Sequence, residues 1–306
     1  MRRHSIITAL HANADVTYKK CVNDNGTITS CEGSIMPQVH QEPSESAIFT
    51  QCMFKSLSYT NSGGAISFSS SSTLTISDSI FTSCTTDDHG GAVYATNCGL
   101  VTLRRVIYIS CSCSANTRGG GAVYILEVPI MPEITDNCFI SCVSRVDGGG
   151  LYFHSNSASS VDNIPVKGSK FIGCVANGDT GEGGIDADGG GLVFWRNDHT
   201  LGVSHTLFTK CESKLRAGGS FVTINEDYFD HVIRFCFYCE NVSPSGRNAL
   251  IHFNDTDGKP WDIVFFHSFT SDNDLSDSLV QDYYEPTTIT DNWLPQGTIA
   301  FLNNTH

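Results

Sequence analysis

One short motif recurs along most of this chain, and it limits the fold more than any other feature. Each copy has two glycines, a small or aliphatic residue and an apolar residue, and an aromatic-x-x-cysteine group follows about 20 residues later. Strong copies lead from Gly64 to Cys84, Gly91 to Cys111, Gly121 to Cys142, Gly150 to Cys174, Gly191 to Cys211 and Gly219 to Cys239. Weaker copies flank them at Gly33 and Asn248. The return from cysteine to the next glycines varies in length, as expected for surface loops that join rigid units.

Each copy also contains three short runs in which apolar and polar residues alternate. In the first strong copy these runs are residues 65–68, 73–76 and 79–81, and Ser, Asn, Asp or Gly separate them in every copy. Such runs predict three strands per repeat, and none of the copies has helical periodicity. A repeat of about 30 residues cannot bury its own apolar face, so the copies must stack. We therefore predict an all-β parallel β-helix of about nine coils with three strands per coil. Parallel crossovers favour right-handed winding.

The repeat resembles that of a known family. Gly63-Gly64-Ala65-Ile66, Gly90-Gly91-Ala92-Val93 and Gly120-Gly121-Ala122-Val123 match the Gly-Gly-Ala-(Ile/Val) half of the repeat in chlamydial polymorphic outer-membrane proteins. That family continues with Phe-x-x-Asn, where this chain has cysteine in place of asparagine. The cysteine-rich version is similar to large surface-protein families of parasitic protists. The resemblance covers roughly residues 30 to 270. It implies a right-handed, pectin-lyase-like β-helix that is displayed on a surface and adhesive, and it names no catalytic residues.

The repeats follow one another without a linker, so we predict one β-helix domain over residues 1–306. Residues 1–30 are expected to be irregular, and residues 276–306 to form a fading last coil and tail. Both ends of such a stack would expose strand edges. The sequence is therefore expected to be part of a longer rod, or to stack end to end on a partner.

Charge and hydropathy exclude several classes of partner. The chain has 18 basic and 32 acidic residues and a net charge of −14, which argues against nucleic acid and anionic membranes. No apolar run is long enough for a membrane-spanning helix. The basic start at Met1 precedes an apolar run that is too short for a signal peptide. We expect a cell-surface or extracellular protein whose leader is missing from this sequence, with a cytoplasmic protein as the alternative.

Glycosylation sequons do not decide between these locations. They stand at Asn25, Asn241, Asn254 and Asn303. Their number is about what chance predicts for a chain rich in Asn, Ser and Thr, so whether the protein is a glycoprotein stays open.

The 13 cysteines look at first like a disulfide framework. Seven of them share the repeat position, namely Cys52, Cys84, Cys111, Cys142, Cys174, Cys211 and Cys239. In stacked coils they would form one column, but parallel in-register neighbours aim their Cβ atoms the same way, which opposes disulfide formation. We therefore predict a structural ladder of buried thiols beside a ladder of phenylalanines. The alternative is disulfide pairing that involves the off-register residues Cys21, Cys31, Cys98, Cys113, Cys138 or Cys236. Zinc is less favoured, because no histidine lies at finger spacing.

A second column is predicted to face outward. Two positions after the last glycine of each copy the residue is apolar throughout, and strand alternation turns the next position to the outside. That position is aromatic in four successive coils, at Tyr94, Tyr124, Phe153 and Phe194. We predict an aromatic stripe that binds a glycan or a protein partner. The alternative is that this column is buried or that loops cover it.

The longest loop, residues 175–190, is rich in acidic side chains. Asp179, Glu182, Asp186 and Asp188 lie there among glycines, and clustered carboxylates on a loop are candidate Ca²⁺ ligands. A solvated charged loop is the alternative. No other cofactor is predicted.

The same loop edge is the one place where catalysis would fit. Polysaccharide lyases of the β-helix fold pair Ca²⁺-binding acids with a Lys or Arg base, parts that Asp186, Asp188 and Lys214 or Arg216 could take. The motifs of pectin hydrolases are absent, and fold alone is no argument for an enzyme. We therefore favour a non-enzymatic adhesive module that binds a glycan or protein partner. A carbohydrate-active enzyme and a purely structural rod segment are the alternatives.

Overall fold

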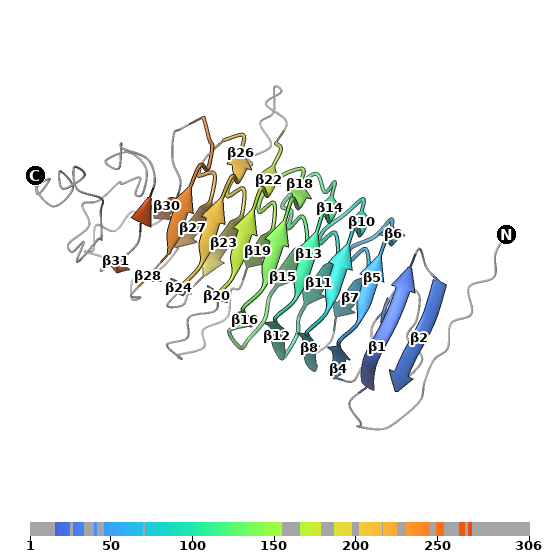
Figure 1. Ribbon diagram of the computed structural model, residues 1–306. Coiled ribbons are helices and arrows are strands. Elements are labelled where there is room, and N and C mark those ends of the chain that lie inside the picture. Colours follow the sequence, from blue (N-terminus) through green and yellow to red (C-terminus); the bar gives the residue numbers. More distant parts are fainter. Residues whose placement is uncertain are drawn as a thin grey trace, which may run out of the picture.

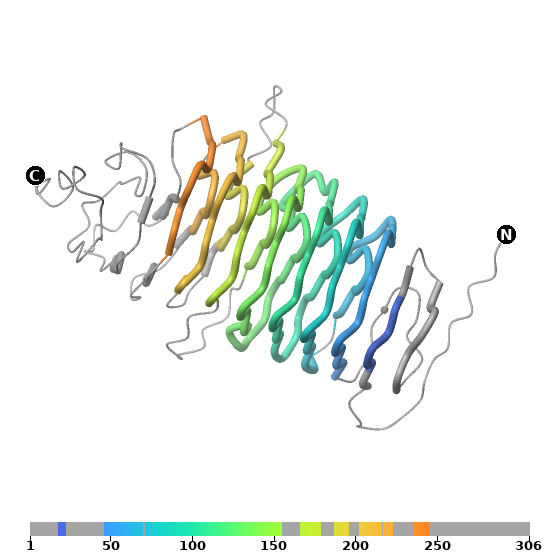
Figure 2. Tube along the Cα trace, in the orientation of Figure 1, coloured from blue at the N-terminus to red at the C-terminus, as the bar shows by residue number. Residues whose placement is uncertain are grey.

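The chain forms an elongated parallel β-solenoid, described here from a computed structural model (Figure 1). The structure describes residues 16–24, 27–33, 40–41, 46–69, 71–154, 166–178, 187–197, 202–215, 217–224, 231–234, 236–244, 249–253, 263–266 and 269–270. All regular elements within these residues are strands, and none is a helix. Figure 2 shows how the chain winds repeatedly around a common axis. The predicted all-β stacked architecture is therefore confirmed.

The strands form three sheets that run along the rod. The eight-stranded sheet consists of β3 (His40–Gln41), β7 (Ile66–Ser69), β11 (Val93–Thr96), β15 (Val123–Leu126), β19 (Leu151–His154), β23 (Leu192–Asn197), β27 (Ser220–Ile224) and β30 (Ala249–Phe253). The six-stranded sheet consists of β6 (Ser58–Tyr59), β10 (Thr85–Thr86), β14 (Ser112–Cys113), β18 (Val143–Ser144), β22 (Val175–Ala176) and β26 (Glu212–Ser213). Each strand pairs in parallel with its equivalent in the next turn.

The eighteen-stranded sheet contains two columns of parallel strands. The first column is β4 (Ala47–Thr50), β8 (Thr73–Ser77), β12 (Leu100–Arg104), β16 (Glu133–Thr135), β20 (Val166–Lys167), β24 (Gly202–Ser204), β28 (His231–Arg234) and β31 (Ile263–Phe266). The second is β5 (Met53–Lys55), β9 (Ile80–Thr82), β13 (Ile107–Ile109), β17 (Cys138–Ile140), β21 (Lys170–Ile172), β25 (Leu207–Thr209), β29 (Phe237–Cys239) and β32 (Phe269–Thr270).

A turn contains four short strands, where the sequence predicted three. The three predicted runs of the first strong copy become β7, β8 and β9, and the two-residue strand β10 follows the cysteine. Two residues are too few to show an alternating pattern, so these strands escape sequence analysis.

The predicted number of coils is too high. Five turns carry the chain from β6 to β26 through all three sheets, so the solenoid has about five turns and not nine. The weak N-terminal copy contributes β6 to the six-stranded sheet, whereas the weak C-terminal copy, within the described residues, contributes β30, β31 and β32 to the other two sheets and none to this one.

The N-terminal segment is more regular than expected. It forms an antiparallel hairpin of β1 (Val16–Asp24) and β2 (Thr27–Gly33), and β1 also pairs in parallel with β4 and β5. The hairpin therefore covers the edge that the first turn would otherwise expose. Residues 276–306, the predicted last coil and tail, lie outside the described residues.

Single residues with positive φ bend each turn. Asp78 (φ 50°) joins β8 to β9, Ser83 (φ 51°) follows β9, and Gly90 (φ 67°) precedes β11. Equivalent residues of most other turns also have positive φ. One left-handed residue changes the direction of the chain without the longer loop that would interrupt the stacking.

The second glycine of each pair is required for a different reason. A Cβ atom on Gly91 would lie 2.2 Å from the carbonyl oxygen of Gly121 and 2.5 Å from that of Ser112. Only glycine lets the backbones of neighbouring turns approach so closely.

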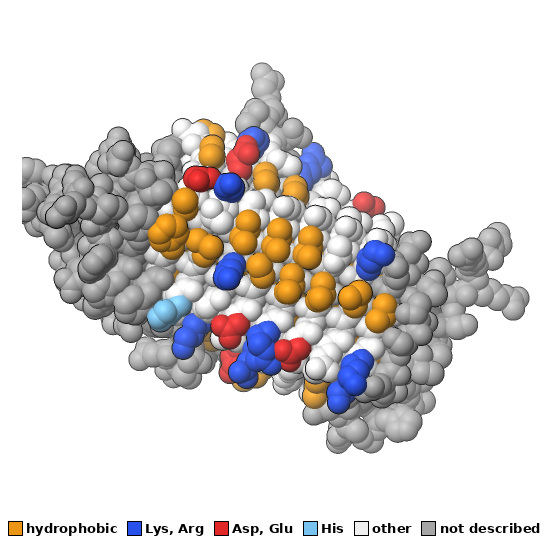
Figure 3. All heavy atoms as spheres, in the orientation of Figure 1, with side chains coloured by type: hydrophobic (Ala, Val, Ile, Leu, Met, Phe, Trp, Pro, Cys, Tyr) orange, Lys and Arg blue, Asp and Glu red, His pale blue; other side chains and the backbone are white. Residues whose placement is uncertain are grey.

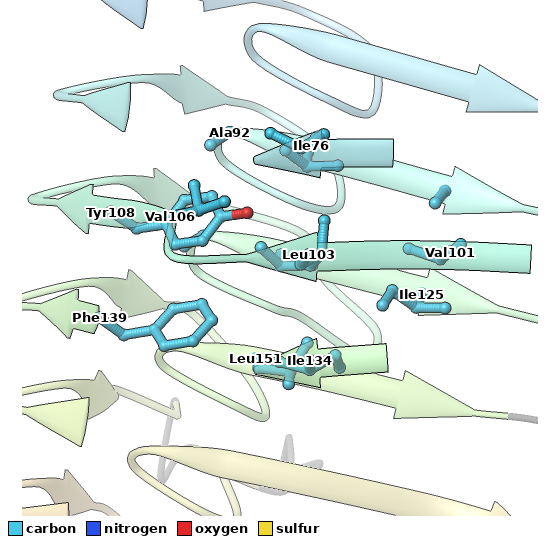
Figure 4. Packing of buried hydrophobic residues seen from close by; sticks show 14 of the residues in the cluster. Ile76, Ala92, Val101, Leu103, Val106, Tyr108, Ile125, Ile134, Phe139 and Leu151 are labelled. Carbon is cyan, nitrogen blue, oxygen red and sulfur yellow. The ribbon is translucent and has the colours of Figure 1, made fainter. Parts of the chain in front are cut away.

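The core is a stack of inward side chains from successive turns. Its centre is a ladder of rings on the middle residue of the second strand column: Phe54, Phe81, Tyr108, Phe139, Phe171, Phe208 and Tyr238. Tyr108 and Phe139 are stacked with ring centres 4.8 Å apart and an interplanar angle of 12°, and aliphatic residues such as Leu103 and Ile134 pack beside them (Figure 4). In-register stacking of one residue type therefore fills the interior without a helix.

Candidate functional site

Five cysteines of the predicted ladder form one column beside the ring ladder. Cys84, Cys111, Cys142, Cys174 and Cys211 are buried free thiols. Each Sγ lies 3.4 to 3.8 Å from the carbonyl oxygen of the ring residue in the preceding turn, as Cys142 does from Tyr108. Burial raises the pKa of the Cys142 and Cys211 thiols well above the usual value. All five are fully buried packing groups, and at Cys142 and Cys211 the thiolate that would react or bind a metal is disfavoured.

Two cysteines assigned to this ladder belong elsewhere. Cys52 pairs with the position of Ser79, at the corner between the first and second strand columns, where its backbone N donates to Ser79 Oγ. Cys239 pairs with Thr209 on the outer surface, two residues before the ladder position. Cys52 ends a Phe-x-x-Cys group and Cys239 ends a Cys-x-x-Cys group. Both groups have the spacing of the repeat, but neither cysteine is in its register.

The alternative of disulfide pairing applies only near the N-terminus. Cys21 is disulfide-bonded. The eleven cysteines with described side chains beyond it, including Cys98, Cys113, Cys138 and Cys236, are free. The side chain of Cys31 lies outside those that the structure describes.

The predicted aromatic stripe is wrong in its second half. Phe153 and Phe194 are fully buried and point into the core. The error lies in the third glycine of Gly148-Gly149-Gly150, which pairs with the position of Ala122 and not with that of Gly121. A register error of one residue exchanges the two faces of a strand. Tyr94 and Tyr124 are placed on the outer face, as predicted.

The outward column of the eight-stranded sheet is Ser67, Tyr94, Tyr124, Tyr152, Val193 and Phe221. The Tyr94 and Tyr124 rings are stacked 5.6 Å apart, and those of Tyr124 and Tyr152 are 4.9 Å apart. Tyr124 is 4% exposed and Tyr152 is fully buried, so only the Tyr94 ring, which is half-buried, is open to a ligand.

Polar side chains border this tyrosine column. Arg118 precedes β15 yet reaches His154, with 3.2 Å between Nη1 and Nδ1, and its guanidinium lies 5.2 Å from the centre of the Trp195 ring. Its side chain therefore extends across the column and helps to cover it. At the other end, the His89 ring packs 4.6 Å from that of Tyr124 and pairs with Asp88. Burial lowers the pKa of His89, which the Asp88 carboxylate partly offsets.

The predicted calcium site is largely untested. Asp179, Glu182 and Asp186 lie outside the described residues. Asp188 is fully buried, and its backbone N donates to Oδ1 of Asp147 at 3.0 Å. Among the residues that the structure describes, no group of three or more His, Cys, Asp or Glu side chains is arranged to hold a metal ion.

The candidate lyase residues are only partly described. Arg216 and Asp186 lie outside the described part of the chain. The Lys214 Nζ contacts the Glu212 carboxylate on the surface. The neighbouring Leu215 N donates to Ala187 O, which places this turn beside that of Asp188. The side chains of Lys214 and Asp188 nevertheless differ, since one is exposed and ion-paired and the other is buried.

A surface that sequence analysis missed lies on the second strand column of the eighteen-stranded sheet. The residues on either side of each core ring point outward, and we call Met53, Ile80, Ile107, Ile109, Ile140, Ile172, Leu207 and Phe237 the outer apolar face. Met53, Ile107 and Phe237 are 39%, 36% and 39% exposed. Figure 3 shows hydrophobic side chains in rows that run along the rod, with charged side chains along both borders. The signal was present in triplets such as Ile107-Tyr108-Ile109, whose ring is flanked by aliphatic residues on both sides.

The surroundings of this face differ in charge from the rest of the chain. Its described charged neighbours, on the two strand columns from β4 to β29 and their corners, are Lys55, Arg104, Arg105, Lys167, Lys170 and Lys210 against Asp78, Glu133, Asp136 and Glu240. Six basic and four acidic residues leave a small positive excess, on a chain with a net charge of −14. A partner that carries carboxylates would therefore meet a weakly positive surface here.

Comparison with known proteins identifies no relative. The chain matches no protein-family model, no curated protein and no solved structure. A search of the described residues also finds no helix that is long and apolar enough to cross a membrane. The candidate sites therefore depend on geometry alone.

Proposed function

We propose that this chain is a non-enzymatic interaction rod, displayed at a cell surface, that binds a partner protein through its outer apolar face. The observation that carries the proposal is the row of outward aliphatic and aromatic side chains, three of them more than a third exposed. Soluble monomers rarely expose a contiguous apolar patch of this kind without a partner. The likeness of the repeats to those of surface-protein families supports the location.

The charges that border this face specify the partner further. The rod as a whole repels acidic proteins, but the small positive excess beside the outer apolar face reverses that repulsion locally. We expect a partner whose surface presents apolar side chains among carboxylates. Lys170, which stands within the apolar rows, is the residue best placed to meet such a carboxylate.

Right-handed winding is part of the proposal. It rests on the general preference of parallel crossovers for that hand. An experimental electron-density map of the solenoid would decide it.

The test is a binding array with a chemical readout. The wild-type chain is applied to immobilised proteins and glycans, and the supernatant is analysed for cleaved saccharide. We expect retention on protein spots without released product, and loss of retention in the double variant Ile107→Asp and Ile140→Asp. The matched control is Thr75→Asp with Thr102→Asp, which places two charges on the outer face of the first strand column.

Three outcomes would overturn the proposal. These are equal retention of the wild type and the Ile107/Ile140 variant, failure of the wild type to bind any spot, and release of product. Self-association of the wild type that the double variant abolishes would instead identify a second copy as the partner.

A further inference from the structure

The tyrosine column of the eight-stranded sheet ends abruptly at one side. In β11 the outward residue is Tyr94, and its neighbour in β7 is Ser67. One face of the Tyr94 ring is stacked on Tyr124, and its other ring contact is with His89, 6.4 Å away at a tilt of 47°. Among the described residues, no ring therefore covers the face that Tyr94 turns toward Ser67.

The space beside Tyr94 has the dimensions of one ring. Neighbouring strands in a sheet are about 4.8 Å apart, and stacked rings have centres about 4.5 to 7 Å apart. Each turn from Tyr94 to Tyr152 fills this spacing with a phenol ring, whereas the Ser67 side chain has only one carbon and one oxygen atom. Ser67 and Tyr94 are both half-buried, so each keeps some contact with solvent.

Polar groups border this space. The Asp88 carboxylate is 45% exposed and accepts a hydrogen bond from Ser62 Oγ at 2.7 Å. Ser62 belongs to the same turn as Ser67, so the carboxylate is shared between the two turns that enclose the space. Ser69, which is half-buried, lies two residues further along β7 and contributes a hydroxyl group, whereas Thr96 opposite it in β11 is buried and accepts a hydrogen bond from Asn97 Nδ2. Carboxylate and hydroxyl oxygens in these positions can accept hydrogen bonds from a hydroxylated ring.

We propose that this space binds a neutral pyranose ring, stacked on Tyr94 in the position of the missing phenol. The C–H bonds on one face of a pyranose carry partial positive charge and match the negative face of an aromatic ring. Its equatorial hydroxyls then reach the polar border, where Asp88 accepts from them. The same carboxylate repels uronic acids and other anionic sugars, so neutral sugars are preferred. This site does not depend on the outer apolar face.

Calorimetry and saturation-transfer NMR on the full chain test the proposal. The probes are neutral gluco-, galacto-, manno- and N-acetylhexosamine oligosaccharides, each beside its uronate counterpart where one exists. We expect binding of at least one neutral probe, with saturation of the ring protons, and weaker binding of its uronate form. Tyr94→Ala is expected to weaken binding about tenfold, and Tyr94→Phe to retain it.

Two further variants separate binding from folding. Ser67→Tyr extends the ladder into the space, so it should abolish binding while the melting temperature stays unchanged or rises. Tyr59→Ala removes a half-buried tyrosine of the six-stranded sheet and should leave binding intact. The proposal is overturned if no neutral probe binds, if Ser67→Tyr binds as the wild type does, or if uronates bind more tightly. Ile107→Asp with Ile140→Asp should leave saccharide binding unchanged, so this site and the apolar face can fail independently.

Discussion

Asn241 takes the ladder position of Cys211 in the following turn and makes stronger bonds there. Its Oδ1 accepts from the backbone N of Cys211, and its Nδ2 donates to the carbonyl oxygen of Phe208, both at 3.0 Å. The Cys211 thiol makes only the second kind of contact, 3.4 Å from Phe171 O. Tyr238-x-x-Asn241 thus has asparagine at the position that cysteine holds in the five preceding turns. The two residue types are alternative ways to fasten a corner of one turn to the turn before it.

Replacement of Asn241 by alanine should destabilise the last turns. The change leaves the Cys211 N–H and the Phe208 carbonyl without these partners, and an unsatisfied buried group costs about 1 to 3 kcal/mol. We expect a decrease of that size in the free energy of unfolding, measured with urea. Asn177→Ala is the matched control, because Asn177 is exposed, and should change it by less than about 0.5 kcal/mol. Equal effects of the two variants would contradict the role assigned to Asn241.

The Asn241 sequon should carry no glycan in the folded protein. The amide nitrogen that would be modified donates to Phe208 O, and the side chain is partly buried. We expect glycopeptide mass spectrometry of the protein from a glycosylating host to find Asn241 unmodified. Folded protein with a glycan at this residue would disprove the hydrogen bond.

The repeat was sufficient to predict a stacked parallel fold but not the register of every turn. Gly64 and Gly91 are each followed by alanine, whereas Gly149 is followed by Gly150, so the last glycine no longer marks the same position. Because strand residues alternate with a period of two, this single ambiguity moved Phe153 from the core to the surface. A glycine run contains no side chain from which the register could have been read.

The candidate surfaces were only partly predictable for a related reason. Sequence alternation separates inward from outward residues only when outward residues are polar. In triplets such as Ile107-Tyr108-Ile109 both faces are apolar, so the pattern could not show which side is exposed. The burial of Tyr124 depends on His89, which comes from the preceding turn, and on Arg118, whose side chain reaches toward the following turns, and contacts between turns leave no local pattern.

Gly91 should be among the least replaceable residues of the chain. A methyl group there would lie 2.2 Å from the Gly121 carbonyl oxygen, so the turns must separate. We expect Gly91→Ala to lower the free energy of unfolding by about 3 kcal/mol or more. Gly173→Ser is the control, because the nearest atom to its added Cβ is 3.6 Å away and serine adopts the same positive φ at Ser83, Ser110 and Ser141. That change should stay within about 1 kcal/mol. A larger loss of stability in Gly173→Ser than in Gly91→Ala would show that the close approach of the turns is absent.

Thiol reactivity should divide the cysteines into two groups. Of the eleven free cysteines, Cys138 and Cys239 are half-buried and the other nine are buried. The thiolate is the reactive form, and burial holds the pKa of Cys142 high, so its thiolate fraction at pH 8 is very small. We expect a disulfide reagent at pH 8 to modify only Cys138 and Cys239 rapidly, and the remaining thiols only after unfolding. Peptide mapping identifies them, and rapid modification of Cys142 in native protein would contradict the buried column.

The protein should lose stability in alkaline solution. Burial raises the pKa of the Cys142 and Cys211 thiols and of the Tyr108 and Tyr238 phenols, and it raises that of Tyr18 to about 12. The unfolded chain then releases these protons at lower pH than the folded one. Their contribution is thus complete below about pH 8.5, the pKa of a free thiol, and declines as the pH rises toward the folded values.

The slope of that decline can be assigned to a single residue. Each thiol that ionises only in the unfolded state reduces the free energy of unfolding by about 1.4 kcal/mol per pH unit. We expect urea unfolding to show that the free energy of unfolding decreases between about pH 8.5 and 10. In Cys142→Ala the slope of this decrease should be smaller by the contribution of about one proton. Cys138→Ala removes a thiol that is only partly buried, so its slope should remain closer to that of the wild type. A stability that is flat over this range would mean that Cys142 and Cys211 ionise equally in both states, which would contradict their full burial beside the stacked rings.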